Sequence, residues 1–445
     1  MINIHFIAIG GSVMHDLAIC MKKQGYNITG SDDKFHDPSK SKLAEHNLLP
    51  AKEGWDINNI TSSLDLIVLG MHAKEDNPEL IKAVKMNIKI VSYPELVYNN
   101  SKNKTRIVIA GSHGKTTITS MISHVLKKQK IDFDYVLGAK VAGLEGNVKL
   151  SKAPIILIEG DEYLSSKIDK KPKFLHYKPH IAVLSGISWD HINVFPTNNI
   201  YIKQFKYFIN TILETLIYNI EDQVVASLID ENLNIKYIPY KTHDYKIKDN
   251  DLTVCNDKYK MLIIGQHNFQ NLNAAKNVCL NIGVKTEDFY LSINDFTGAS
   301  NRLEKIFQSN RYIFYRDFAH SPSKVKATVN AVHEIYSQKI VSIYELHTFS
   351  SFNKSFLKEY KNTLVNSDIA VLYYDQKNIA NKGVSDFNDN YIKECFNRSD
   401  LIVINEKKKL IDYIQRISEL KFVLLMMSSG NFSGLTNKEI KNYLE

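Results

Sequence analysis

Short apolar runs alternate with polar and glycine-containing stretches along the whole chain. In the first hundred residues, four such runs predict β-strands over residues 2–9, 26–29, 64–69 and 88–91. A helix is predicted between the first two strands, over residues 15–24. This strand–helix–strand order predicts a small parallel sheet of Rossmann type.

A second block of strands and helices follows a polar link at residues 99–103. Its apolar runs at residues 107–109, 155–158 and 181–184 each end in a cluster of polar residues. Parallel strands present their carboxyl ends at one edge of a sheet, where the ligands of open α/β proteins bind. We therefore expect the three polar clusters to converge.

A third block begins near Gly298, after a stretch at residues 215–262 that is expected to form short strands and turns. Helical patterns separate its apolar runs, which lie at residues 312–315, 340–346, 369–374, 401–404 and 422–427. The chain is therefore predicted to be an α/β protein with three domains, at residues 1–103, 104–297 and 298–445.

Composition narrows the class of protein. The chain has 445 residues, 44% of them hydrophobic, which is enough for several domains with buried cores. It has no apolar run of about 18 residues and no signal-peptide pattern, so we expect no membrane span and a cytoplasmic location. Four widely spaced cysteines favour free thiols. The formal charge is +8, but lysines and acids are mixed along the chain, so no nucleic-acid partner is predicted; the oligomeric state is open.

The most informative stretch follows the strand at residues 107–109 and consists of Gly111, Ser112, His113, Gly114, Lys115, Thr116 and Thr117. Glycines let backbone N–H groups turn toward phosphate oxygens, and the helix expected next adds its positive N-terminal end. Lys115 is expected to reach the β- and γ-phosphates of a nucleotide, and the Thr116 hydroxyl to bind Mg²⁺. The loop predicts a phosphate-loop nucleotide-binding protein, with two residues between its glycines where the usual pattern has four.

Acidic residues supply the other ligands that a metal–nucleotide site needs. Mg²⁺ prefers oxygen ligands, and the strand at residues 155–158 is followed by Glu159, Asp161 and Glu162. We expect one of these carboxylates to join Thr116 at the metal. His191 follows the third strand, so it is a candidate for a further ligand.

The order of these motifs resembles the Mur ligase family, the ATP-dependent amide-forming enzymes of peptidoglycan synthesis. The resemblance covers the whole chain and rests on the motifs GSHGKTT, EGDEY, WDH, GxHNxxN, NRLE and DFAH. It implies a Rossmann-like N-terminal domain that binds a UDP-sugar, a central phosphate-loop ATPase domain and a Rossmann-like C-terminal ligase domain. It also implies ATP and Mg²⁺ as cofactors.

The resemblance assigns roles to residues that match the family's motifs. The implied metal ligands are Thr116, Glu159 and His191. The implied nucleotide contacts outside the phosphate loop are His267, Asn268, Asn271, Arg302 and Asp317. The implied catalytic residues are Lys115, His191, Arg302 and His320. The residues implied to bind UDP-N-acetylmuramate are Gly10, Gly11, Ser12, Met14, Ser31, Asp32, His72 and Asn77.

Within the family, residues 159–163 and 173–179 resemble the murein-peptide recycling branch. That branch joins UDP-N-acetylmuramate to the peptide L-alanyl-γ-D-glutamyl-meso-diaminopimelate. The alternative is the branch that adds L-alanine, which usually has Ser-Asp where this chain has Tyr163-Leu164.

Several positions depart from the family's pattern. They are Arg316 and Ser321, where the motif usually has Asp and His, Gly186, where Asn is expected, and Leu346-His347, where the recycling branch has Pro-Arg. These departures concern the recognition of the incoming peptide more than the ATP machinery. Lys206 is either an ordinary surface lysine or the equivalent of a lysine that some relatives carbamylate.

Two other classes of function compete with a ligase. A dinucleotide-dependent oxidoreductase needs a three-glycine fingerprint around Gly10, but Ala8 and Val13 stand at its outer positions. A non-catalytic phosphate-loop module is the other class. Release of phosphate from ATP that depends on a UDP-sugar acid distinguishes a ligase from both.

Overall fold

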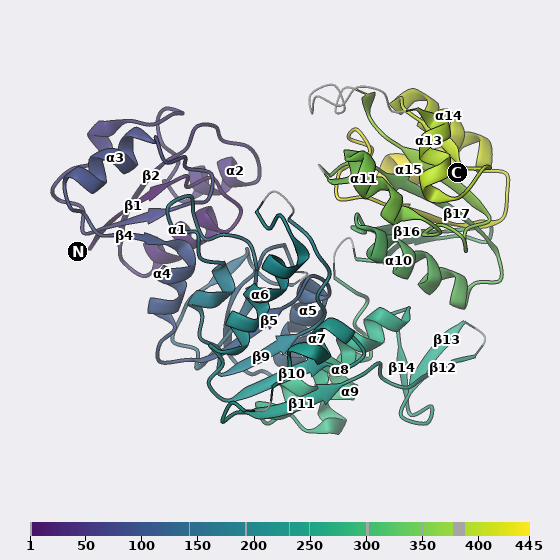
Figure 1. Cartoon of the computed structure of the whole chain (residues 1–445), viewed down its shortest axis with the longest axis horizontal. Coiled ribbons are helices and arrows are strands. Elements are labelled where there is room, and N and C mark those ends of the chain that lie inside the picture. Colours follow the sequence, from purple (N-terminus) through teal and green to yellow (C-terminus); the bar gives the residue numbers. More distant parts are fainter. Residues whose placement is uncertain are drawn as a thin grey trace. The chain divides into compact units, whose positions relative to one another are not determined.

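The computed structural model describes residues 2–141, 143–191, 194–230, 232–248, 250–299, 302–348, 350–376 and 388–445. These residues form four β-sheets with helices between the strands (Figure 1). The chain divides into two compact units. One unit comprises Met1–Lys241 and Asn271–Ser292, and the other comprises Thr242–Gln270 and Ile293–Glu445.

The first sheet has four parallel strands in the order β2-β1-β3-β4, with bounds β1 (Asn3–Ile7), β2 (Asn27–Ser31), β3 (Leu66–Leu69) and β4 (Ile90–Ser92). Its helices are α1 (Met14–Lys23), α2 (Ser39–Glu45), α3 (Pro78–Lys85) and α4 (Tyr93–Asn100). Side chains of α1 and α4 share an apolar cluster with Phe6, whereas those of α3 pack with Ile7. Neighbouring residues of a strand face opposite sides, so helices cover both faces of the sheet. The predicted Rossmann-type block is confirmed.

The second sheet has seven strands in the order β11-β10-β9-β5-β8-β6-β7, and β7 alone is antiparallel among the described pairs. The strands are β5 (Thr105–Ala110), β6 (Phe133–Val136), β7 (Val148–Lys149), β8 (Ile155–Gly160), β9 (Ile181–Leu184), β10 (Thr215–Asn219) and β11 (Lys236–Tyr240). The helices α5 (Lys115–Lys128), α6 (Asn198–Ile209) and α7 (Gln223–Leu228) belong to this block. Because β5 lies between β8 and β9, the three polar clusters follow adjacent strands.

The stretch at residues 215–262 contains a helix, α7, that the sequence did not predict. Its last strands form a separate antiparallel sheet of β12 (Tyr245–Lys248), β13 (Asp251–Val254) and β14 (Tyr259–Met261). Two helices follow, α8 (Gln266–Asn281) and α9 (Thr286–Ile293). The small sheet belongs to the second compact unit, although the sequence placed it in the central domain; the three domain boundaries stay a prediction.

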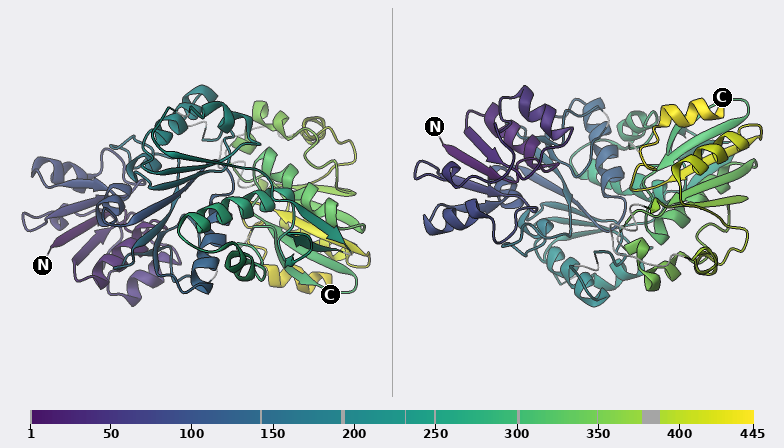
Figure 2. Two further views of the ribbon diagram at one scale, coloured as in Figure 1. Left: turned by 90° about the horizontal axis from the view of Figure 1, so that it is seen from below. Right: turned by 90° about the horizontal axis from the view of Figure 1, so that it is seen from above.

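The fourth sheet has the strand order β15-β16-β20-β17-β18-β19, with β15 antiparallel. Its strands are β15 (Glu304–Gln308), β16 (Tyr312–Asp317), β17 (Lys339–Glu345), β18 (Ile369–Tyr373), β19 (Ile402–Ile404) and β20 (Phe422–Met427). Its helices are α10 (Pro322–Ile335), α11 (Lys354–Leu357), α13 (Asp389–Phe396), α14 (Lys407–Ile417) and α15 (Asn437–Leu444). The chain crosses from β16 to β17 and returns from β19 to β20, so right-handed crossovers place α10 and α14 on opposite faces (Figure 2).

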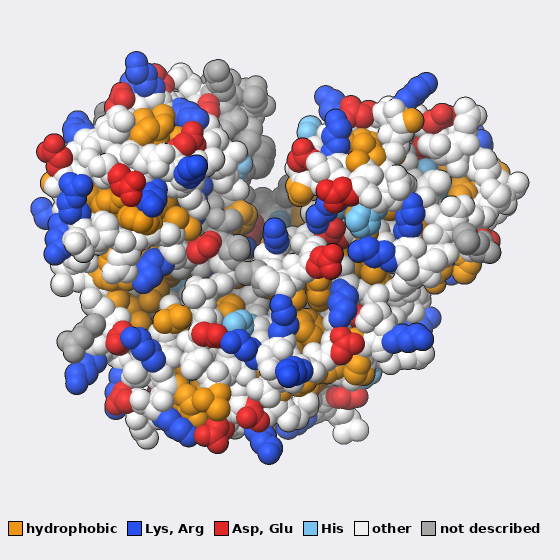
Figure 3. Space-filling model, turned by 180° about the vertical axis from the view of Figure 1, so that it is seen from behind, with side chains coloured by type: hydrophobic (Ala, Val, Ile, Leu, Met, Phe, Trp, Pro, Cys, Tyr) orange, Lys and Arg blue, Asp and Glu red, His pale blue; other side chains and the backbone are white. Residues whose placement is uncertain are grey.

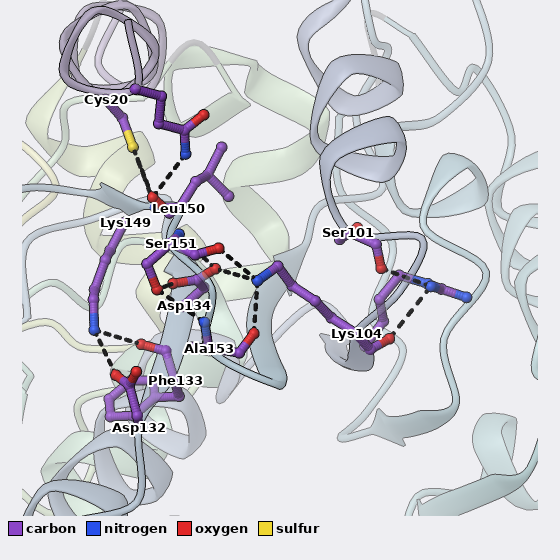
Figure 4. A network of polar contacts seen from close by, with 12 residues as sticks. Cys20, Ser101, Lys104, Asp132, Phe133, Asp134, Lys149, Leu150, Ser151 and Ala153 are labelled. Carbon is purple, nitrogen blue, oxygen red and sulfur yellow. Dashed lines mark hydrogen bonds and ion pairs between the residues drawn. The ribbon is translucent and has the colours of Figure 1, made fainter.

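The polar link predicted at residues 99–103 is shorter than expected, because α4 continues through Asn100. The remaining link is firmly attached to the central block (Figure 4). Ser101 is completely buried, and its carbonyl accepts a hydrogen bond from Arg106. Lys104 forms a 2.9 Å ion pair with the buried Asp134 and donates to two backbone carbonyls. These contacts fix the end of the link to the central block.

The surface carries charges of both signs. On the face drawn in Figure 3, lysine and arginine side chains are interspersed with aspartate and glutamate. None of the described helices combines the length and apolar character needed to cross a bilayer. All four cysteines are free thiols, and Cys255 is the exposed one.

Candidate functional site

The loop between β5 and α5 has the backbone of a phosphate cradle. Gly111 and Gly114 have φ angles of +129° and +76°, in a region that side chains rarely adopt. A Cβ atom at Gly111 would collide with the Ser185 hydroxyl, and one at Gly114 would collide with the side-chain amide of Asn271. Both positions therefore require glycine, and Asn271, predicted on the adenine side, lies beside the loop.

Other members of the predicted loop are held by the strand next to it. The Ser112 N–H donates to the Gly186 carbonyl over 2.8 Å. The Ser185 hydroxyl donates to the carbonyl of His113. Thr117 is buried in the first turn of α5. These contacts fix the loop at the carboxyl end of β9.

Lys115 points back over the loop. Its ammonium donates to the Gly111 carbonyl over 2.6 Å and lies 3.0 Å from the carboxylate of Glu162. Burial opposes the charge of Lys115, but the nearby carboxylates, Glu162 foremost, raise its pKa. Lys115 is therefore a half-buried, charged donor at the position where a nucleotide phosphate is expected.

Glu162 is the acid at the centre of these contacts, and the predicted ligand set left it out. Its side chain is only 2% exposed. Burial alone would raise its pKa, yet the Lys115 and His191 charges hold that pKa well below the usual range. The sequence did mark it as one of three acids at the end of β8 and just beyond it, but spacing cannot tell which of the three faces the lysine.

Thr116 and Glu159 form the second pair at the loop. The Thr116 hydroxyl donates to the Glu159 carboxylate over 3.1 Å, and Glu159 is 7% exposed. Two adjoining oxygen groups suit a hard cation such as Mg²⁺, so these residues fit the implied metal. Within the described part of the chain, no group of three or more His, Cys, Asp or Glu side chains is arranged to hold a metal by itself.

His191 lies at the same edge of the sheet but faces a different acid. Its Nε2 atom is 3.4 Å from Glu162, and the Tyr163 ring meets its ring edge-on at 5.0 Å between centroids. Its φ angle of +56° is unusual for a residue with a side chain. Burial opposes the charge, but contact with Glu162 and the charge of Asp190 raise the pKa of His191. Its role as a metal ligand stays a prediction.

The second unit holds the remaining residues predicted on the nucleotide side. The Arg302 guanidinium lies over the Phe318 ring at 4.5 Å, and the His320 ring meets the same ring edge-on. Asn268 and Arg302 line one small cavity of about 30 Å³. The carboxylate of Asp317 accepts hydrogen bonds from the Leu303 N–H and the Thr328 hydroxyl.

Burial lowers the pKa of His267, although the charge of Asp317 opposes this effect. Together with Asn268, Arg302, Asp317 and His320, His267 belongs to the same compact unit. Their roles toward a nucleotide stay predictions.

The glycine-rich turn after β1 is organised by Asp32. The Gly10 N–H donates to the Asp32 carboxylate over 2.7 Å, and burial raises the pKa of Asp32 to about 6. Met14 is buried at the start of α1, whereas Ser12 is exposed. The Asn147 amide of the central block reaches the Ser12 carbonyl at 3.4 Å. The predicted UDP-sugar turn thus touches the central block.

Other residues predicted to bind the sugar serve the N-terminal block internally. The buried Ser31 hydroxyl donates to Glu79. The Asn77 side-chain oxygen caps α3 by accepting from the Leu80 N–H over 3.0 Å. His72 is exposed. Contacts of these side chains with substrate stay predictions.

The departures from the family's motifs have distinct surroundings. Arg316 is buried, with its guanidinium 4.5 Å from the Phe432 ring and within the field of Glu345. Leu346 is 1% exposed and packs inside the fold. Lys206 lies exposed in the last turn of α6, as an ordinary surface lysine does.

The parallel sheets and the glycine loop define a phosphate-loop nucleotide-binding protein of the α/β class. Residues 3–105 match the model of the Mur ligase family, catalytic domain, and residues 109–279 match that of the Mur ligase middle domain. The chain is 32% identical over 386 residues to the UDP-N-acetylmuramate–L-alanine ligase of Caldicellulosiruptor bescii, covering 82% of each chain. It is 25% identical to the UDP-N-acetylmuramate–L-alanyl-gamma-D-glutamyl-meso-2,6-diaminoheptandioate ligase of Haemophilus influenzae, covering 98% of each.

Solved structures have the same fold. The UDP-N-acetylmuramate-alanine ligase of Thermotoga maritima superposes with a TM-score of 0.72 at 18% identity, over 100% of this chain and 99% of its own. The murein peptide ligase of Psychrobacter arcticus superposes with a TM-score of 0.66 at 20% identity, over the same shares. The chain belongs to the Mur ligase family. It is therefore an ATP-dependent ligase that forms amide bonds.

Proposed function

We propose that this ligase joins the carboxylate of UDP-N-acetylmuramate to the amine of L-alanyl-γ-D-glutamyl-meso-diaminopimelate in the cytoplasm. The observation that carries the ATP-dependent step is the convergence of Lys115, Thr116, Glu159 and His191 at adjacent strand ends. Lys115 and the Thr116–Glu159 pair lie where α5 begins, directly after a loop with two required glycines.

The first step is phosphoryl transfer to the sugar. A carboxylate oxygen of UDP-N-acetylmuramate attacks the γ-phosphorus of ATP, and the bond from that phosphorus to the β–γ bridging oxygen breaks. ADP is the leaving group, and the sugar carboxylate becomes an acyl phosphate. Lys115 stabilises the charge on the transferring group, and Arg302 is expected to act with it. Thr116 and Glu159, with His191 as the expected further ligand, would hold Mg²⁺, and the ion would neutralise phosphate charge.

The second step forms the amide. The free α-amine of the acceptor attacks the acyl carbon, and phosphate leaves from the tetrahedral intermediate. A base takes the proton of the amine, and His320 is the candidate for this role. Its Nδ1 atom lies 2.8 Å from the Phe318 carbonyl.

The choice of the tripeptide rests on the residues after β8. Tyr163 stands where the alanine-adding branch usually has Ser, and its ring packs against His191. Identity to the relatives favours the second candidate, L-alanine. The C. bescii enzyme, at 32% identity, is named for alanine, and the H. influenzae enzyme at 25% is named for the peptide.

Replacement of the phosphate lysine tests the ATP role. Lys115→Ala is expected to lower kcat by about a hundredfold or more, because it removes the donor that stabilises the transferring phosphoryl group. Phosphate and ADP release with UDP-N-acetylmuramate is the measurement, and circular dichroism checks the fold. Lys128→Ala, at the exposed end of the same helix, is the matched control and should retain wild-type turnover. Normal turnover by Lys115→Ala would refute the role.

Product analysis tests the acceptor. The purified chain is incubated with ATP, Mg²⁺ and UDP-N-acetylmuramate, together with either the tripeptide or L-alanine. Mass spectrometry is expected to find the UDP-linked tripeptide product. Product formed with alanine alone would replace the tripeptide by the second candidate. Dependence of ADP release on UDP-N-acetylmuramate is the control that separates a ligase from a non-catalytic ATP-binding module.

A further inference from the structure

Tyr201 of α6 connects two parts of the phosphate site, although it lies far from both in the sequence. Its side chain is completely buried. Its hydroxyl lies 2.8 Å from the Ser112 hydroxyl of the phosphate loop and 3.0 Å from the Glu162 carboxylate. A single phenol therefore touches both the loop and the acid that holds Lys115.

The direction of this hydrogen-bond chain follows from its ends. The Ser188 N–H donates to the Ser112 hydroxyl oxygen over 2.9 Å. At the other end, the Glu162 carboxylate is the acceptor. The Tyr201 hydroxyl must therefore donate to Glu162, and the Ser112 hydroxyl must donate to Tyr201. With this orientation, each hydroxyl of the hydrogen-bond series from Ser188 to Glu162 both donates and accepts one hydrogen bond.

The phenol ring is fixed by its neighbours. The rings of Phe195 and Phe205 lie 5.4 Å and 5.2 Å from it between centroids, in tilted and edge-on arrangements. The hydroxyl is thus held in place by aromatic packing as well as by its hydrogen bonds. Tyr201 gives Glu162 a permanent donor that does not depend on Lys115.

We propose that Tyr201 is a positioning residue for nucleotide binding, because its hydrogen bond allows Glu162 to release Lys115 to an incoming phosphate. The Lys115 ammonium cannot keep its full contact with Glu162 while it binds a phosphate group. When Lys115 moves, the buried carboxylate keeps the donors Tyr201 and His191. Without the phenol hydroxyl, release of Lys115 would leave Glu162 less satisfied, and a nucleotide would compete less well for the lysine. This inference rests on the proposed role of Lys115.

The test is Tyr201→Phe, which removes the hydroxyl and keeps the ring. We expect the Kd of Mg-ADP, measured by calorimetry on the full chain, to rise about two- to tenfold, the range that one net hydrogen bond covers. The KM for ATP should rise by a similar factor. The kcat and the KM for UDP-N-acetylmuramate should stay within about twofold of wild type, because the effect precedes chemistry.

Tyr135→Phe is the matched control. Tyr135 is also buried, and its hydroxyl donates to the Glu145 carbonyl over 2.8 Å, outside the phosphate loop. Its loss should leave the Kd of Mg-ADP unchanged. The rise in Tm that Mg-ADP causes, taken relative to each protein's own Tm, separates nucleotide affinity from stability.

Two results would overturn the inference. One is an unchanged Kd for Mg-ADP in Tyr201→Phe. The other is a change in all of these quantities together, with kcat and Tm lowered and the KM values for both ATP and UDP-N-acetylmuramate raised. That pattern would indicate a structural role only. If Mg-ADP does not bind the wild-type chain, the proposed role of the phosphate loop fails first, and the inference fails with it.

Discussion

Glu162 balances the charges of the phosphate site. A buried carboxylate is costly unless donors surround it, and Lys115, Tyr201 and His191 supply those donors. The same acid also restrains the lysine that is expected to bind phosphate. Nucleotide binding at this loop thus requires Lys115 to exchange the Glu162 carboxylate for a phosphate group. The residues around Glu162 determine the free-energy cost of that exchange.

Asp32 makes stability depend on pH. Its pKa is raised by burial to about 6 in the folded chain, above the ordinary value of 3.8. The folded state therefore holds this proton more tightly, and the resulting stability is present below pH 3.8 and lost as the pH rises through 6. Asp32→Asn should lose less stability than wild type between pH 4 and pH 7, as measured by urea unfolding across that range. Parallel pH profiles of the two proteins would contradict the assignment.

At the scale of elements, the start of α5 depends on the backbone of Gly114. This residue precedes the helix in a left-handed conformation, with the Asn271 amide beside it. The exposed N–H groups of the first helical turn can then face a phosphate. The element supplies the anion site only if the loop keeps this shape.

Gly114→Ala is expected to weaken Mg-ADP binding by tenfold or more. The new methyl group would collide with Asn271, and alanine would also be strained in the left-handed backbone conformation of this position. Gly283→Ala is the matched control. Gly283 has a φ angle of +94° with open space around it, so alanine there adds strain of about 1–2 kcal/mol and no collision. Calorimetric titration should find wild-type affinity in the control. Equal effects of both changes would mean that strain alone, and not the loop's shape, is responsible.

At the scale of the whole molecule, the N-terminal and central blocks form one unit with a continuous apolar core. Polar contacts reinforce their junction. Cys20 of α1 reaches the carbonyl of Leu150 (Figure 4). Gln24, which follows α1, donates to the same carbonyl, and the Asp16 carboxylate accepts from the Asn147 N–H. The predicted UDP-sugar turn is therefore held at a fixed place relative to the phosphate loop.

The buried ion pair between Lys104 and Asp134 in the central block should matter for stability. Asp134→Ala is expected to lower the free energy of unfolding by about 3–5 kcal/mol, because Lys104 would keep a charge without its partner. Asp132→Ala is the control two residues away. Its ion pair with Lys149 is exposed, so the change should stay within about 1 kcal/mol. Urea denaturation measures both, and similar losses would contradict the distinction between buried and exposed pairs.

Local patterns predicted most of the elements but not their exact ends. The strands at residues 181–184 and 422–427 were predicted with the bounds that the structure has. The polar residues Asn99 and Asn100 predict a linker, yet they complete α4 because helix ends are set partly by what packs against them. The two-residue strand β7 was missed, since so short a run has no periodicity of its own.

The sequence by itself determined the chemistry of the loop: two glycines, a lysine and a threonine between a strand and a helix define a phosphate site through backbone geometry that is local. Only the tertiary structure decided that Lys115 faces Glu162, that Thr116 faces Glu159 and that Tyr201 reaches both Ser112 and Glu162. These partners lie 39 to 89 residues apart along the chain. Which of three neighbouring acids meets the lysine depends on how adjacent strands and α6 pack, and no spacing within one segment carries that information.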